Sequence, residues 1–136
     1  MQRRHSGRIV TEQPPYSLLV RGIEAEGLPV CQQDGMGVLP WSPLAGGCCR
    51  AGGGSGRSRR GPTRAARIPS RYDRSVPGNQ ATAAVDALAV LAEQAGTTLV
   101  HLAIAFVLRH PGVTSAIIGP RTMQHLTSQL GAVTWC

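Results

Sequence analysis

Apolar residues in the first third of the chain alternate with turn residues in the order strand, helix, strand. Residues 16–20 (YSLLV) follow a proline pair, and their composition predicts a short strand. A helix is predicted over about residues 22–34, ending at Gly35. Its core-facing side chains are Ile23, Leu28 and Cys31. The apolar run at 37–41 (GVLPW) predicts a second strand, so this third of the chain is expected to form a βαβ unit.

Helical periodicity returns from residue 80. Apolar residues recur at spacings of three and four until Gly96, which is expected to close the helix; they are Val85, Leu88, Leu91, Ala92 and Ala95. Thr98 is a predicted N-cap for a second helix, which ends at His110-Pro111. The apolar set of that helix is Leu99, Leu102, Ala103, Phe106 and Val107.

A β-branched run at 113–118 predicts a strand near the end of the chain. Gly119-Pro120-Arg121 follows it as a loop, and Thr122 is expected to cap a final helix with Leu126 and Leu130 facing inward. Helices and strands that alternate in this way predict an α/β fold.

Residues 48–79 differ from both flanks. They contain Gly52, Gly53 and Gly54 in succession, three prolines and most of the arginines. Because they offer little apolar surface to offset the entropy of ordering, we expect a mobile Gly/Arg/Pro-rich loop within the domain.

Composition narrows the class of protein. The chain has 136 residues, 42% of them hydrophobic, which suits one ordinary globular domain. It contains no run of 18 apolar residues, and the basic start is not followed by an apolar segment, so we expect neither a membrane span nor a secretory signal. A cytoplasmic protein is the resulting expectation.

All 14 basic residues are arginine, against 7 acidic residues, which gives a formal charge of +7. Eight of them lie within residues 50–74, where only Asp73 opposes them. This density supports an alternative function, a basic nucleic-acid-binding module. The segment has no base-reading motif and no aromatic series for stacking bases, which disfavours that alternative.

The four cysteines, Cys31, Cys48, Cys49 and Cys136, show no metal-ligand spacing. We therefore expect reduced thiols and no metal site.

Two loops combine small residues with a strand end, which places backbone amides where they favour an anion. The first is the loop after Trp41, whose ring is placed to stack on a planar group. The second runs from Ile118 to Thr122, where Arg121 suits a phosphate. Alone, the first signal is weak, because a tryptophan at a strand end is more often a core residue, and the second is equally compatible with a tight turn and a solvated arginine.

Three ordered motifs resemble one family. They are residues 12–19 (EQPPYSLL), 35–47 (GMGVLPWSPLAGG) and 102–121 (LAIAFVLRHPGVTSAIIGPR). Together they resemble the C-terminal half of aldo-keto reductases, in the branch similar to potassium-channel β subunits. The resemblance implies a partial aldo-keto reductase domain over residues 8–132, as the C-terminal part of an incomplete (β/α)8 TIM barrel that starts just before the sixth strand.

The resemblance also implies a cofactor, NADP(H), and the residues that hold it. Gln13 is similar to the glutamine that binds the nicotinamide carboxamide, and Trp41 to the aromatic that stacks on the nicotinamide. The pyrophosphate segment corresponds to Ser42, Pro43, Leu44, Ala45 and Gly46. The loop for the 2'-phosphate and adenosine corresponds to Gly119, Pro120 and Arg121, followed by His125 and Gln129, where the family commonly has Gln and Asn.

Catalysis in the family uses a tyrosine proton donor, a lysine, an aspartate and a histidine, all in the N-terminal half. This chain has no lysine, and Tyr16 and Tyr72 are not in the matching motif. We therefore expect it to be inactive alone, with no catalytic residue of its own. A separately encoded N-terminal half-barrel is a possible partner.

Relatives typically read Gly-Gly-Trp-Leu-Ser-Gly-Arg where this chain reads GGCCRAG at 46–52. Losing one base from codons for the family string yields the observed one. Our hypothesis is that residues 48 to about 61 are translated out of frame and that the ending 132–136 reflects a second slip. Intact codons in frame in a related strain would contradict it.

Overall fold

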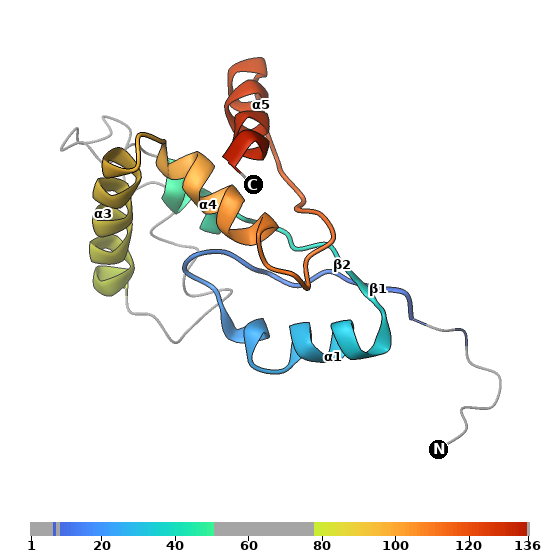
Figure 1. The fold of residues 1–136 in the computed structure, drawn as a ribbon. Coiled ribbons are helices and arrows are strands. Elements are labelled where there is room, and N and C mark those ends of the chain that lie inside the picture. Colours follow the sequence, from blue (N-terminus) through green and yellow to red (C-terminus); the bar gives the residue numbers. More distant parts are fainter. Residues whose placement is uncertain (1–6, 8, 51–77, 136) are drawn as a thin grey trace.

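The computed structural model describes residues 7, 9–50 and 78–135; for residues 50 and 78–82 it describes the backbone only. Short parallel strands, helices and 3₁₀ turns (η) alternate along the chain (Figure 1). In chain order they are β1 (Thr11–Glu12), η1 (Gly22–Glu24), α1 (Gly27–Asp34), β2 (Gly37–Val38), η2 (Ala45–Arg50), α3 (Gly78–Gln94), α4 (Leu99–Leu108), α5 (Met123–Leu130) and η4 (Gly131–Trp135). The predicted α/β class is confirmed.

Three chain segments lie side by side in parallel. Thr11 pairs with Gly37 and Glu12 with Val38, so β1 and β2 form a parallel pair. Further along, Trp41 forms parallel bridges with Pro15 on one side and Ile117 on the other. The segment 37–41 therefore lies between the other two segments.

The strand predicted at 16–20 is wrong, because the pairing segment lies earlier in the chain. Ser17 and Val20 exchange backbone hydrogen bonds of 3.0 and 3.2 Å, which makes a tight turn. The Ser17 hydroxyl accepts from the amides of Leu19 and Val20, so it competes with a strand ladder. Pro14 has no N–H to donate, and the ladder is interrupted there before the bridge at Pro15.

The helix predicted over about 22–34 forms as two pieces, η1 and α1. Pro29 lies in the first turn of α1, where a missing N–H costs nothing. Gly35 takes a left-handed φ of 62°, and the Met36 amide donates to the Cys31 carbonyl at 2.8 Å. The predicted end at Gly35 is confirmed, because this conformation favours glycine.

Two buried clusters hold the elements together. The first joins β2, α1 and α4 through Tyr16, Leu28, Cys31, Val38 and Val107. The second joins η2, α3 and α4 through Cys49, Ala89, Ala92, Leu99 and Ala103. Because α4 contributes to both, it is the central helix of the fold.

The caps of the last two helices follow the sequence signals. Thr98 Oγ1 accepts from the His101 amide at the start of α4, and Thr122 Oγ1 accepts from the His125 amide at the start of α5, both at 3.2 Å. Of the two side chains predicted to face inward on α5, Leu126 is half-buried, but the prediction is wrong for Leu130, which is 53% exposed, whereas Gln129 is only 6% exposed. Gln129 faces the loop after β2. The apolar periodicity of α5 does not predict this contact.

Of the predicted loop over 48–79, the first residues belong to η2 and the last to α3, and 51–77 lie outside the described residues. No single helix in the described part is both long and apolar enough to span a membrane; only the pair Ala83–Gln94 and Leu99–Leu108 reaches those criteria jointly, with a 94° bend between them.

Candidate functional site

A cleft of about 330 Å³ lies between the loop after β2 and the segment that leads into α5. Its volume falls in the range of about 300–1,000 Å³ that is usual for small-molecule sites. Eight of the twelve residues predicted for cofactor binding line it: Ser42, Pro43, Leu44, Gly46, Gly119, Arg121, His125 and Gln129. Segments about 75 residues apart in sequence thus meet at one surface.

The loop after β2 has an unusual backbone. Ser42 and Ala45 take left-handed φ values of 62° and 50°, and Gly46 and Gly47 follow with 66° and 100°. Left-handed backbone costs about 1–3 kcal/mol at a residue other than glycine and is concentrated at binding sites. The Ser42 side chain accepts from the Gly46 amide at 2.9 Å, which fixes the loop in this shape.

The opposite wall favours a negative charge. Arg121 stands directly before the Thr122 cap, so its guanidinium and the positive end of α5 belong to the same wall. A Cβ added to Gly119 would meet nothing within 4 Å, which leaves this side open to a ligand. The cleft's described lining includes one arginine and no carboxylate. Its donors therefore fit a phosphate group.

The four remaining predicted residues lie beside the cleft without lining it. Trp41 Nε1 donates to the backbone carbonyl of Gln13 at 3.2 Å, so the two predicted nicotinamide residues are in contact. Ala45 belongs to the same loop as the lining residues, and Pro120 lies between Gly119 and Arg121.

Three lining residues are not among those predicted: Gly47, Ile117 and Ile118. The glycine pair at 46–47 is the available signal for the first. The sequence predicts the two isoleucines only as residues of a strand. That they reach the cleft depends on the pairing of Ile117 with Trp41, which the sequence does not specify.

The cysteines of the described residues belong to no cluster of metal-ligating side chains. No group of three or more His, Cys, Asp or Glu side chains comes together there. Burial raises the pKa of Cys48, and it raises the pKa of Cys49 to about 12. Since the thiolate is the nucleophile, Cys49 is protonated and unreactive near neutral pH.

The arginines that support the nucleic-acid alternative lie at 57–74, outside the described residues, as does the side chain of Arg50. Tyr72 also lies outside them.

A second polar cluster surrounds Glu24, away from the cleft. Arg21 binds its carboxylate through two contacts of 2.8 Å, and the Tyr16 hydroxyl donates to it at 2.7 Å. The guanidinium of Arg21 also lies 5.3 Å from the centre of the Phe106 ring. The hydrogen bonds from Arg21 lower the pKa of Glu24, whereas burial and the Glu24 contact raise the pKa of Tyr16.

We expect Glu24→Gln to lower the free energy of unfolding at neutral pH by about 1–2 kcal/mol, as a charge-assisted hydrogen bond contributes. The folded state depresses the pKa of Glu24, so its contribution is present above the unfolded value of about 4.3 and is lost as pH falls. The difference between wild type and variant should therefore shrink below about pH 4. Urea unfolding at a series of pH values measures it.

Glu26→Gln is the matched control, because Glu26 is exposed and makes no cap hydrogen bond to α1. It should change the stability by less than about 0.5 kcal/mol at every pH. Equal losses in both variants would contradict a specific role for the Glu24 cluster.

A sequence model of the Aldo/keto reductase family matches residues 1–135. The chain belongs to this family, whose fold is a (β/α)8 barrel. The membership that the three motifs predict is therefore confirmed.

The chain is similar in sequence to proteins from bacteria and a plant. It is 38% identical over 132 residues to "Uncharacterized oxidoreductase YrpG" of Bacillus subtilis (strain 168), covering 97% of this chain and 37% of that protein. It is 35% identical over 123 residues to "Protein tas" of Escherichia coli (strain K12), covering 90% and 35%. It is 31% identical over 133 residues to "Probable voltage-gated potassium channel subunit beta" of Arabidopsis thaliana, covering 91% and 38%. The chain thus spans just over a third of the length of these relatives.

Proposed function

We propose that this chain is the cofactor-facing, C-terminal part of an aldo-keto reductase barrel and that it binds NADP(H). The phosphates and adenosine would bind in the cleft between Ser42 and Arg121, and the nicotinamide would lie toward Trp41 and Gln13. The observation that carries the proposal is the meeting of the 42–47 loop and the 117–129 segment at a single cleft with a cation and no carboxylate in its described lining.

The residues present suit the two ends of such a cofactor. The N-terminus of α5 suits phosphate, and Arg121 suits the extra 2'-phosphate that distinguishes NADP from NAD. The indole of Trp41 is held by its bond to Gln13, which would fix a stacking surface beside the carboxamide partner.

The bound cofactor would supply a hydride to a carbonyl carbon, and a protein acid must then protonate the oxygen. Tyr16 is unsuited to that role, since it is 1% exposed and its hydroxyl is engaged with Glu24. Its raised pKa also makes it a weaker acid than an ordinary phenol. We propose that the proton donor comes from outside this chain and that the chain alone reduces no carbonyl.

Arg121→Gln should weaken NADPH binding by about 10–100-fold and leave NADH binding within about threefold, because only NADPH presents the 2'-phosphate. The chain contains two tryptophans, so Trp135→Phe makes Trp41 the sole reporter. Fluorescence titration of that background with each cofactor measures both affinities.

Arg109→Gln provides the matched control, since it removes the same charge from a residue that does not line the cleft. It should leave both cofactor affinities unchanged. An unaltered Trp41 signal at millimolar NADPH would overturn the binding proposal, and equal losses in both variants would overturn the role of Arg121.

A further inference from the structure

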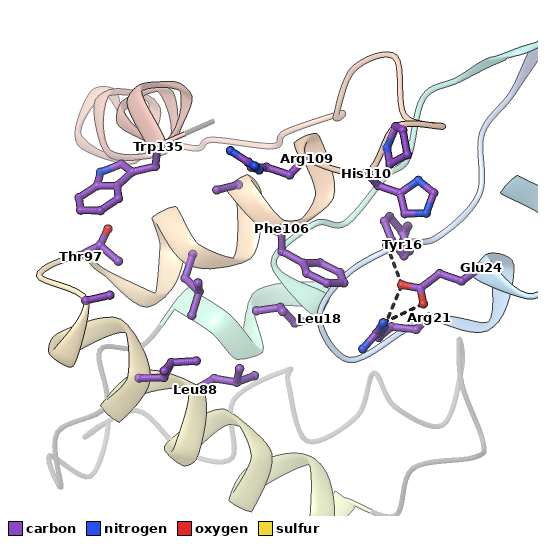
Figure 2. A pocket seen from close by; sticks show the side chains of 15 residues that line it. Tyr16, Leu18, Arg21, Glu24, Leu88, Thr97, Phe106, Arg109, His110 and Trp135 are labelled. Atoms are coloured by element: carbon purple, nitrogen blue, oxygen red, sulfur yellow. Dashed lines mark hydrogen bonds and ion pairs between the residues drawn. The ribbon is translucent and has the colours of Figure 1, made fainter. Parts of the chain in front are cut away.

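A second and larger cavity, of about 870 Å³, lies along α4 (Figure 2). Its walls come from the turn after β1, from α3 and α4, and from the C-terminal η4. Trp135 and Thr97 lie at one end of it and the Tyr16–Glu24–Arg21 cluster at the other. It shares no lining residue with the candidate cofactor cleft. We call it the α4 groove.

The lining of the α4 groove is mainly apolar. Leu88 and Leu91 of α3 face it, and Leu91 is 51% exposed although it belongs to the apolar stripe of its helix. Phe106 and Leu102 contribute from α4, and Trp135, 46% exposed, closes one end. Large apolar side chains left open along one continuous groove mark a binding surface.

The charges of the groove are unbalanced. Glu24 is its only carboxylate among the described lining residues, and that carboxylate is already bound by Arg21 and Tyr16. Arg109, an exposed residue at the end of α4, also lines the groove, and it forms no ion pair within the described part of the chain. The groove therefore offers one unused cation beside apolar walls.

A polar atom without a partner lies in the same groove. Thr97 Oγ1 is buried and makes no hydrogen bond to any described residue. Figure 2 shows this oxygen pointing toward Trp135. A buried hydroxyl usually has a partner, so this one is an exception within the wall of the groove.

The size of the groove favours a small ligand over a protein. Fifteen residues line it, whereas a stable protein interface takes about 20–30 residues a side. Its volume lies within the range of about 300–1,000 Å³ typical of small-molecule sites. A second copy of the chain is disfavoured because each copy carries a formal charge of +7.

We propose that the α4 groove binds an amphiphilic carboxylate, in which an aliphatic chain lies along Leu88, Leu91 and Phe106 and the carboxylate pairs with Arg109. The guanidinium supplies two parallel N–H donors to a carboxylate, and the apolar walls remove the chain from water. This site is independent of the proposed cofactor site, because the two share no residue.

Two single-chain amphiphiles test the charge requirement. The Trp41→Phe variant leaves Trp135 as the only tryptophan, so fluorescence then reports on the groove. We expect dodecanoate, kept below its micelle concentration, to change the Trp135 signal saturably at one molecule per chain. Dodecyltrimethylammonium has the same tail with the opposite charge and should bind about tenfold more weakly.

Arg109→Gln should weaken the binding of dodecanoate about tenfold and remove the difference in affinity between the two amphiphiles. Arg121→Gln removes an equal charge from the other cleft and should change neither affinity. Far-UV circular dichroism checks that the variants fold, and Arg109→Lys should retain most of the preference for the anion. Because salt screens ion pairs, added salt should also weaken the binding of dodecanoate, but not that of dodecyltrimethylammonium, to the protein that retains Arg109.

If the protein that retains Arg109 bound both amphiphiles equally well, the proposal would be overturned, because apolar contact alone would then explain the binding. An unchanged affinity for dodecanoate in a folded Arg109→Gln variant would overturn it too. NADPH titration in the presence of dodecanoate separates this site from the cofactor cleft, and competition between them would contradict the independence of the two sites.

Discussion

Replacing Leu28 by alanine should lower the free energy of unfolding by about 2–5 kcal/mol, because the surrounding side chains cannot fill the cavity. Leu28 is 0% exposed and lies in the cluster that joins α1 to β2 and α4. The expected loss is a large share of the about 5–15 kcal/mol that keeps an ordinary domain folded. Urea unfolding followed by far-UV circular dichroism measures it.

Val30→Ala is the matched control within the same helix. Val30 is 48% exposed, so its truncation should change the stability by less than about 1 kcal/mol. Similar losses at both positions would mean that α1 is not packed through Leu28. The comparison therefore tests the position of the first cluster as well as its strength.

The ends of helices were predictable because their signals are local. Gly35 and Gly96 take left-handed φ values of 62° and 69°, a conformation that glycine reaches without cost. Thr98 and Thr122 accept backbone hydrogen bonds within the first turns of their own helices. Each signal acts between residues a few positions apart, so the sequence alone is sufficient to recognise it.

The position of the first strand and the inner face of α5 depend on distant partners. β1 is defined by its register with Gly37 and Val38, and nothing within residues 11–20 specifies that register. Helical periodicity fixes the spacing of inner positions but not which neighbour the helix meets. Gln129 is buried in place of Leu130 because the loop after β2 lies there.

The two cavities also differ in how far the sequence alone could predict them. The residues of the cofactor cleft were predicted through motif resemblance, and the structure brings eight of them to one surface. The α4 groove had no such signal, because its lining joins the turn at 16–24, both long helices and η4. The ion pair that occupies Glu24 and leaves Arg109 unused appears only once these segments are packed.

Reduction of a carbonyl by NADPH should require a second segment besides this chain. β1 pairs only with β2 within the described residues, so its outer edge keeps free backbone groups for a further strand. Ile9 and Val10, next to that edge, are 64% and 62% exposed. These features support docking of an N-terminal half-barrel, which would bring the tyrosine and lysine that the family uses for proton transfer.

The test combines this chain with the part of the Bacillus subtilis relative that precedes the matched region. With 4-nitrobenzaldehyde as a model carbonyl, loss of NADPH absorbance should be absent for either segment alone and present for the pair. Since a positioned general acid accelerates such a step by about 10²–10⁴-fold, changing the proton-donating tyrosine of the added segment to phenylalanine should abolish most of the rate.

Arg121→Gln in this chain should raise the KM for NADPH of the pair and leave kcat nearly unchanged, because its contact is with a part of the cofactor remote from the reacting atoms. Reduction by the pure chain with no second segment would contradict the proposed division of labour. A pair that assembles, as measured by sedimentation, binds NADPH and still does not turn over would contradict it as well, since the added segment would then hold no working proton donor.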